Sequence, residues 1–360
     1  TTERRNLLSE VSDSSGSRRY SAGYAMVRKH AVLILSSLLL QDYIKYRDYI
    51  IHRFLIATVD DDAEVSTLAE STLCGPLLTK TPTLFFDHFV EALFVLNGCK
   101  AARGTYSVAE DSGGGGITGS YGHGSAAING VNLYGEKGRV KRLAIYEKML
   151  TQMSDEEKIG ITARLAKEVL GRALESGDLH MACRHLKRET GASVSKTPDG
   201  IRERRMTSAF NVLVDCFTIL MSPSIRVGKK KGTENGEDFE ADATVANPTA
   251  QLNSAKGRLL SKISRKHLIE AVVPILCQMK ALLEANHSPL LKNLMGYLAD
   301  IFRSYEVEVR DVLASDEILL KELEYDTRQF EKSIKEQGIQ LMQQDLGISP
   351  LQPGTGDRAI

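Results

Sequence analysis

Residues Lys266–Lys332 constrain the fold most strongly, because their apolar side chains recur at the three- and four-residue spacing of amphipathic helices. Two apolar faces follow one another along this stretch: Leu268, Val272, Ile275 and Met279, then Leu291, Leu294, Leu298 and Ile301. The segment Asn286–Pro289 between them predicts a helix end and a new start, with Ser288 as the N-cap. Two helices joined by so short a turn form a helical hairpin, which is the repeating unit of α-solenoids.

Similar helical patterns recur along the rest of the chain, and no stretch shows a convincing strand pattern. The 360 residues exceed the size at which one hydrophobic core usually stops growing. The composition is 42% hydrophobic but contains no Trp, which favours aliphatic helix packing. No strict sequence period is present, which argues against the regular helical repeats and leaves the degenerate, HEAT-like class. The predicted fold class is therefore all-α: an α-solenoid of HEAT-like helical hairpins with long disordered inter-repeat loops.

Glycine-rich and charged stretches divide the chain into segments. The expected order is a disordered N-terminal segment (1–20), HEAT-like repeats (21–97), a Gly-rich flexible loop (98–135), further HEAT-like repeats (136–221), a charged disordered linker (222–255), C-terminal HEAT-like helices (256–338) and a flexible tail (339–360). Within the repeats, Asp61 with Glu64 and Ser154 with Glu157 have the spacing of capping boxes, so both pairs predict helix starts.

The cysteines indicate a reducing compartment, because they are five in number, widely spread and mostly set in apolar helical patterns. No secretion signal is recognisable at the start. The longest apolar segment, residues 31–40, is well short of the roughly 20 residues that span a bilayer, so no membrane partner is expected. A first residue other than Met suggests a fragment of a longer protein.

Three segments carry residue types that could hold a metal or a phosphate. Asp60–Asp62 is interpreted as a helix start, because acidic residues favour helix N-termini. His180, Cys183 and His185 have metal-ligand chemistry, but a structural zinc site needs a second pair of ligands. Gly130–Gly135 resembles the start of a phosphate-binding loop without its lysine. The sequence therefore predicts no metal, no cofactor and no enzymatic activity.

Four blocks resemble one known family: Gln41–Val65, Gly75–Asn97, Lys141–Leu170 and Lys266–Lys332. They are similar to the C-terminal part of the D-type HEAT-repeat (non-SMC) subunit of condensin. The condensin II version is closer than the condensin I version, chiefly because of the segments at Ser154–Leu165 and Leu323–Asp326. The Gly-rich insert Ser112–Ser125 has no counterpart in the family pattern.

The resemblance implies a non-catalytic scaffold that acts in mitotic chromosome condensation and organisation, in the nucleus and on chromosomes. Its implied partners are the condensin kleisin subunit and, through it, the SMC ATPase subunits. Duplex DNA is a further implied partner, and histone tails are an additional candidate. The alternatives are a generic HEAT-repeat adaptor that binds proteins without DNA, and an enzyme that uses the Gly-rich loop or the His-Cys-His cluster.

Two basic clusters are candidate nucleic-acid contacts. The candidate DNA-binding residues are Lys256, Arg258, Lys262, Arg265 and Lys266. The last four fall at i, i+4, i+7 and i+8, so a helix would place them on one face, where they would suit phosphates. A solvated helix face is the alternative interpretation. The second cluster is a candidate basic tether or nuclear-import signal, formed by Arg226, Lys229, Lys230 and Lys231.

An acidic set near the end of the helical region is a candidate docking surface for a basic partner, such as kleisin or a histone tail. Its members are Glu306, Glu308, Asp311, Glu322, Glu324 and Asp326. Nearby aromatic residues could in principle form a cage for methyl-lysine. These are Tyr297, Phe302, Tyr305 and Tyr325. Their helical spacing favours a role in the core instead.

Overall fold

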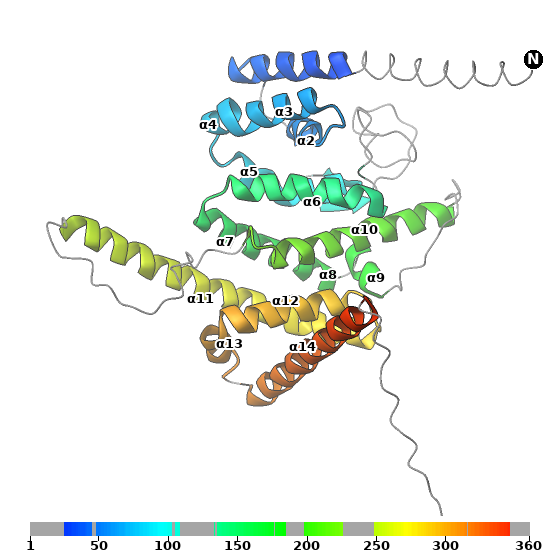
Figure 1. Cartoon of the computed structure of the whole chain (residues 1–360), viewed down its shortest axis with the longest axis vertical. Coiled ribbons are helices and arrows are strands. Elements are labelled where there is room, and N and C mark those ends of the chain that lie inside the picture. The colour runs from blue at the N-terminus through cyan, green and yellow to red at the C-terminus, as the bar shows by residue number, and fades with distance from the viewer. Residues whose placement is uncertain are drawn as a thin grey trace, which may run out of the picture.

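A computed structural model describes residues 25–44, 48–102, 105–108, 133, 135–175, 177–184, 198–225, 248–314 and 316–345. The helices stack in chain order along the long axis of the molecule, from residue 25 at one end to α14 at the other (Figure 1). This arrangement confirms the predicted all-α solenoid. Among the described helices, none is long and apolar enough to span a bilayer.

The first three layers contain short helices. The first helix covers residues 25–40. The second layer comprises α2 (Asp48–Ala57), α3 (Ala63–Thr72), the π-helical segment η1 (Leu73–Leu77) and α4 (Leu78–Lys80). Pro76 lies inside η1, where its missing amide is consistent with the locally widened helix. The third layer pairs α5 (Leu84–Leu96) with α6 (Gly135–Thr151).

The remaining layers contain the three longest described helices, α10, α11 and α14. The fourth layer comprises α7 (Asp155–Arg164), the π-helical η2 (Leu165–Gly171), α8 (Arg172–Leu174), α9 (Asp178–Arg184) and α10 (Pro198–Met221). The fifth layer pairs α11 (Pro248–Ala285) with α12 (Leu291–Ser304), and the last contains α13 (Glu306–Val312) and α14 (Glu317–Asp345). The N-terminal part of α11 projects away from the stack (Figure 1).

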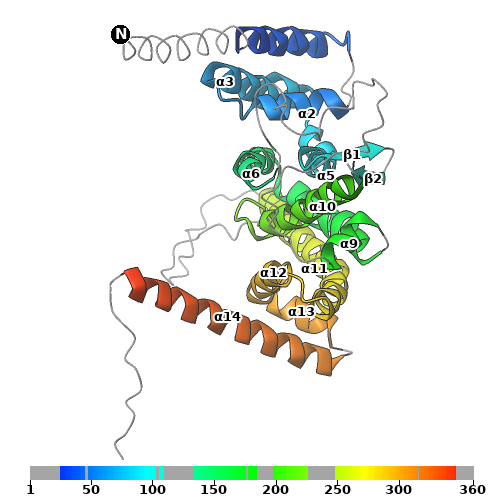
Figure 2. The same cartoon turned by 90° about the vertical axis from the view of Figure 1, so that its right-hand side faces the viewer.

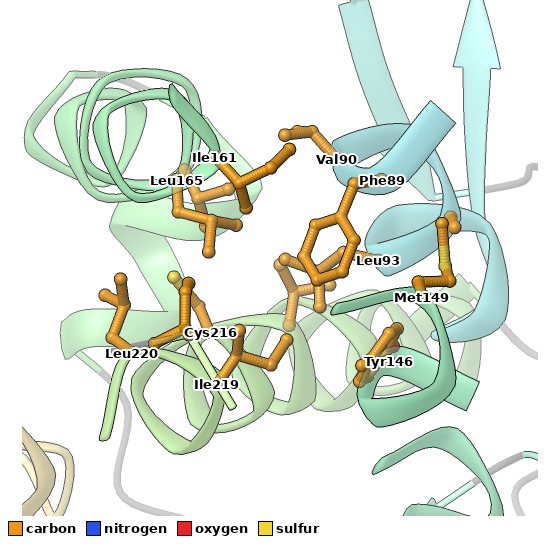
Figure 3. Close-up of a cluster of buried hydrophobic side chains, with 14 of the residues drawn as sticks. Phe89, Val90, Leu93, Tyr146, Met149, Ile161, Leu165, Cys216, Ile219 and Leu220 are labelled. Carbon is orange, nitrogen blue, oxygen red and sulfur yellow. The ribbon is translucent and has the colours of Figure 1, made fainter. Parts of the chain in front are cut away.

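The centre of the core lies around α5, whose sequence is apolar on nearly every side. Phe89 and Leu93 of α5 are fully buried and point toward side chains of α6 and α10, including Tyr146 and Ile219 (Figure 3). The rings of Phe89 and Tyr146 lie 6.0 Å apart between centroids in a tilted arrangement. An apolar helix of this kind is buried between layers, because α2 covers one side of it while α6, α7 and α10 cover the other.

One predicted capping box is confirmed and one is wrong. The Ser154 hydroxyl accepts from the Glu157 amide and the Glu157 carboxylate accepts from the Ser154 amide, as the spacing predicts. At α3 the N-cap is Asp62 and not Asp61, because the Asp62 carboxylate accepts from the amides at positions 64 and 65. Asp61 instead pairs with Lys141 on the neighbouring layer.

The predicted N-cap role of Ser288 is also wrong. The Ser288 amide donates to the Leu283 carbonyl over 2.9 Å, and the His287 amide donates to the Glu284 carbonyl over 3.1 Å. With His287 at φ 49°, these bonds form a Schellman motif that ends α11. The next helix begins only at Leu291, and the buried Ser288 hydroxyl has no hydrogen-bond partner within the described structure.

Three segments differ from the predicted boundaries. The expected Gly-rich loop begins with an antiparallel hairpin beside α5, formed by β1 (Cys99–Ala102) and β2 (Thr105–Val108) with Cys99 opposite Val108 (Figure 2). The region after residue 174 contains α9, which lacks a strong apolar period. The helix expected from residue 256 already begins at Pro248, and α14 continues beyond residue 338 to Asp345.

Candidate interaction surfaces

The predicted DNA-binding residues lie on α11, whose N-terminal part projects from the stack (Figure 1). The helical backbone places Arg258, Lys262 and Lys266 on one face, as the spacing predicts. Lys266 is exposed, and its ammonium lies 4.0 Å from the Glu270 carboxylate. At that distance and exposure the ion pair is weak, so Lys266 stays accessible to an external anion. DNA binding itself stays a prediction.

The other predicted clusters fall partly outside the described residues. Arg226 and Lys229–Lys231 lie there entirely, as do His185 and most of Gly130–Gly135. His180 lies on α9, where its Nδ1 is 3.1 Å from the Ala173 carbonyl oxygen.

Cys183 is the other described member of the predicted His-Cys-His cluster. Its thiol contacts the Met279 sulfur, and burial raises the pKa of this thiol to about 12. A protonated, buried thiol is a poor metal ligand. Within the part of the chain that the structure describes, no group of three or more His, Cys, Asp or Glu residues could hold a metal ion.

The acidic set divides into two groups, and the first surrounds Lys280 of α11. Its Nζ lies 3.0 Å from Glu322 and 2.8 Å from Asp326, both on α14, and 3.0 Å from Glu284 one helical turn away. The Lys280 side chain is only 6% exposed, whereas the three carboxylates remain partly exposed. This Lys280 cluster fixes α14 against α11, a role that the sequence interpretation missed because the partners are far apart in the chain.

The second group surrounds Arg310 of α13. Its guanidinium lies 3.0 Å from Glu306 and 3.2 Å from Glu324. Because these glutamates are already paired, they offer a basic partner less negative potential than the sequence suggests. Glu308 is half-buried and Asp311 is exposed. Docking of a basic segment on this set stays a prediction.

The aromatic residues considered for a methyl-lysine cage differ in their access to solvent. Tyr297 is 6% exposed, and burial raises the pKa of its hydroxyl well above the ordinary value. Tyr325 is 62% exposed. Phe302 and Tyr305 pack at the edge of the core. Three of the four aromatic residues therefore lie in the core or at its edge, as their helical spacing predicts.

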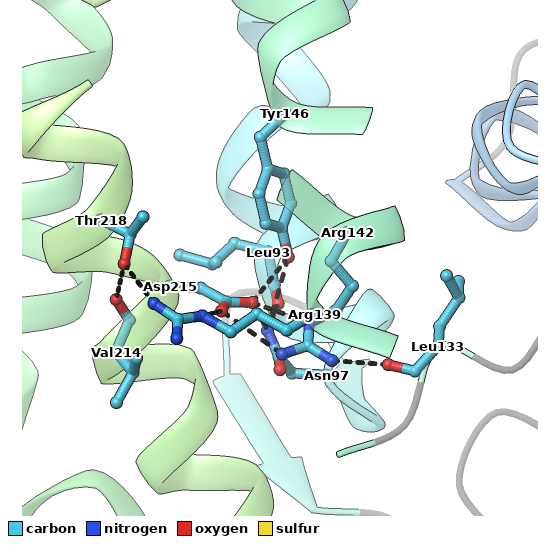
Figure 4. A network of polar contacts seen from close by, with 9 residues as sticks. All are labelled: Leu93, Asn97, Leu133, Arg139, Arg142, Tyr146, Val214, Asp215 and Thr218. Carbon is cyan, nitrogen blue, oxygen red and sulfur yellow. Dashed lines mark hydrogen bonds and ion pairs between the residues drawn. The ribbon is translucent and has the colours of Figure 1, made fainter. Parts of the chain in front are cut away.

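A buried polar network lies at the centre of the stack, around Asp215 of α10 (Figure 4). Nε of Arg142 donates to the Asp215 carboxylate over 2.7 Å, and the Asn97 amide donates to the same carboxylate over 3.0 Å. The Tyr146 hydroxyl is 3.4 Å away, and burial together with the Asp215 charge raises the pKa of that hydroxyl well above its ordinary value. Asp215 and Arg142 are almost fully inaccessible to water.

This Asp215 network cross-links the end of α5 with α6 and α10. Arg142 also donates to the Leu133 carbonyl over 2.6 Å, so the network contacts the chain just before α6 begins. The sequence interpretation did not single out Asp215, although an acid inside the apolar period of α10 is the signal that could have identified it. A second cation, Arg139, lies 3.9 Å from the Asp215 carboxylate, and its side chain is 30% exposed. The arrangement stabilises the stack, and its central Arg142–Asp215 pair is inaccessible to solvent.

Comparison with known proteins identifies the family. A family model described as condensin-2 complex subunit D3-like HEAT repeats matches residues 223–338. The chain is 27% identical to condensin-2 complex subunit D3 of Mus musculus over 314 residues, which cover 86% of this chain and 18% of that protein. It is 30% identical to condensin-2 complex subunit CAP-D3 of Arabidopsis thaliana over 318 residues, with 87% and 21% covered. No solved structure matches the chain.

The chain thus spans about a fifth of the length of these two relatives. A more distant relative, condensin-2 complex subunit hcp-6 of Caenorhabditis elegans, is 18% identical over 315 residues, covering 86% of this chain and 15% of its own length. All of these relatives carry condensin-2 names, which agrees with the resemblance to the condensin II version. The chain therefore belongs to the condensin-2 subunit D3 family of HEAT-repeat proteins.

Proposed function

We propose that this chain is part of a non-catalytic scaffold subunit of a condensin II complex that acts in mitotic chromosome condensation and organisation. The observation that carries the proposal is the similarity to condensin-2 D3 proteins along 86–87% of the chain. The stacked helices support it, because a solenoid presents extended surfaces that bind other macromolecules. The subunit would bind kleisin and, through kleisin, the SMC ATPases, and it would work on chromosomes in the nucleus.

Duplex DNA is the second proposed partner, and the basic face of α11 is the proposed contact. The N-terminal part of α11 projects from the stack (Figure 1). Each phosphate that a lysine or arginine neutralises releases counterions and steepens the salt dependence of binding by about 0.9 log units. Four contacts on one helix face would therefore give a slope of about −3.6 in a plot of log K against log salt.

The test is fluorescence-anisotropy binding to a random-sequence duplex across a salt series. The variant changes Arg258, Lys262, Arg265 and Lys266 to Glu, and we expect it to lose the salt-dependent binding. A matched control changes four basic residues of α14 to Glu, namely Lys321, Arg328, Lys332 and Lys335, and should bind as the unchanged protein does. Equal loss in both variants would contradict a specific DNA track on α11 and indicate a general charge effect.

Kleisin binding is tested separately, by co-expression with the kleisin subunit of the same organism and co-purification. We expect a stable complex. A charge-reversed variant with Glu308 and Asp311 changed to Lys tests the acidic docking surface, because these two residues are outside the Arg310 and Lys280 ion pairs. Kleisin binding without any DNA binding would support the scaffold role and contradict the DNA contact, and failure to bind either partner would contradict the proposed function.

A further inference from the structure

Ion pairs join the side of α6 that faces α3 to the neighbouring layer. Lys141 pairs with Asp61 and Lys148 pairs with Glu70 of α3, and the Lys148 ammonium also donates to the Thr58 carbonyl over 2.9 Å. These contacts lie two helical turns apart along α6, so they join the two layers over much of the helix.

The opposite side of α6, which faces the C-terminal end of α10, contains an open groove. The groove has a volume of about 450 Å³, within the range of roughly 300–1,000 Å³ that is typical of ligand sites. Its floor is apolar: Leu143 and Met221 are half-buried, and Tyr146, Leu150 and Ile219 are almost fully buried. Thr218, Ser222 and Pro223 also line the groove. Toward the start of α6, Arg139 donates to the Thr218 hydroxyl over 3.0 Å and bridges the same two helices.

Glu147 lies on the rim of this groove. It is exposed, and its carboxylate has no hydrogen-bond or ion-pair partner in the part of the chain that the structure describes. The adjacent Lys148 is directed to Glu70 on the other side of α6, so it does not neutralise this rim. The groove therefore combines a mainly apolar lining with one negative charge that has no partner among the described residues.

We propose that this groove, between α6 and the C-terminal end of α10, is a docking site for a peptide segment of another protein. The segment places one apolar side chain of leucine or phenylalanine size on the floor, and it places a lysine or arginine against Glu147. Charge complementarity selects this occupant, because the only charged group on the groove among the described lining residues is the Glu147 carboxylate. A neutral or acidic segment would leave that carboxylate unpaired or repelled.

The test uses synthetic peptide pools and the purified chain, without DNA or kleisin, so its outcome is independent of the proposed function. Each pool has Phe or Leu fixed at the centre and either Lys or Glu fixed at one of the four positions on each side. Binding is measured by fluorescence anisotropy. We expect at least one Lys pool to bind about fivefold more tightly than its Glu counterpart, which corresponds to one exposed ion pair.

The Glu147→Lys variant should reverse this preference, so that the Glu pool binds more tightly than the Lys pool. The matched control is Glu336→Lys, which changes another exposed helical glutamate, on α14, that does not line the groove. It should keep the original preference. Both positions are exposed on helices, so circular dichroism should show unchanged folding and thermal midpoints.

A second variant tests the apolar floor. Leu143→Trp places a larger ring on the half-buried edge of the groove and should abolish binding of every pool. Three results would overturn the proposal: no pool binds at millimolar peptide, the preference does not change in Glu147→Lys, or pools with Ser at the centre bind equally well. The Glu147→Lys result tests the proposed docking site even where Leu143→Trp fails to fold.

Discussion

The Asp215 network and the Lys280 cluster both hold helices together through buried charge, but they differ in their access to water. The Asp215 and Arg142 side chains are 0% and 1% exposed. In the Lys280 cluster the ammonium is 6% exposed, while Glu284, Glu322 and Asp326 are 43%, 55% and 30% exposed. Water can replace a lost partner in the second cluster and cannot do so in the first. The same type of interaction therefore has different consequences in the two regions.

The largest expected effect comes from removing Arg142, the closer of two cations at Asp215. Arg142→Met leaves the buried carboxylate with only Arg139, which lies 3.9 Å away and is 30% exposed, and should lower the free energy of unfolding by about 3 kcal/mol. Urea unfolding followed by circular dichroism measures the change. The neighbouring Lys141→Met, which removes an exposed ion pair to Asp61, serves as the control and should cost less than about 1 kcal/mol. Equal effects of the two variants would show that burial does not make the Arg142–Asp215 pair more important than an exposed pair.

A double variant sharpens this result. Arg142→Met combined with Asp215→Leu removes the unpaired charge as well, so it should recover part of the loss. A double variant less stable than Arg142→Met alone would show that the Asn97 and Tyr146 hydrogen bonds to Asp215 contribute more than the ion pair.

An intermediate effect on stability is expected at His52 of α2. Its side chain is as inaccessible to water as that of Asp215, but it forms no ion pair within the described structure. It is 1% exposed, its Nε2 has no hydrogen-bond partner in the described structure, and burial lowers its pKa to about 3, with a smaller contribution from His88. The unfolded chain binds a proton near pH 6.5 and the folded chain does not, so stability falls as the pH falls from about 6.5 toward 3. At pH 5 the loss is about 2 kcal/mol.

The measurement is urea unfolding at a series of pH values for the unchanged protein and for His52→Leu. The variant lacks the titrating group, so its unfolding free energy should fall less steeply between pH 6.5 and 5. Parallel curves for the two proteins would show that His52 does not remain neutral in the folded state.

The smallest effect is expected at the Lys280 cluster. Lys280→Met leaves three carboxylates that are already partly hydrated, so the cost should be about 1 kcal/mol. High salt screens such exposed charges, and the difference from the unchanged protein should shrink between 0.05 and 1 M NaCl, over which the Debye length falls to about 3 Å. A loss of unfolding free energy as large as that of Arg142→Met, or one that salt does not alter, would contradict the difference between the two clusters.

Features set by neighbouring residues were predictable from the sequence, and features set by distant residues were not. The helix start at Ser154 needs only Glu157, three residues away. The predicted N-cap at Ser288 was wrong because Ser288 belongs to the Schellman motif that ends α11, and the next helix begins only at Leu291. The two buried clusters join residues 73 and 42 positions apart, as in Arg142–Asp215 and Lys280–Glu322, and a pattern of local periods contains no such pairing.

For the candidate surfaces too, features set by neighbouring residues were predictable and features set by distant residues were not. The single face of the basic run on α11 follows from helix geometry and was predictable. The pairing of Glu322 and Asp326 with Lys280 required the packing of α14 on α11, so the acidic set looked more available in the sequence than it is. Glu147 gave no sequence signal at all, because its significance depends on the groove that α10 forms beside it.

The Asp215 network holds both ends of the connection between α5 and α6. Asn97 donates to Asp215 at one end, and Arg142, paired with Asp215, donates to the Leu133 carbonyl at the other. With the two ends of a connection fixed, doubling its length costs only about 0.6 kcal/mol of closure entropy. A fluorescent reporter domain inserted between α5 and α6 should therefore leave the helical layers in register.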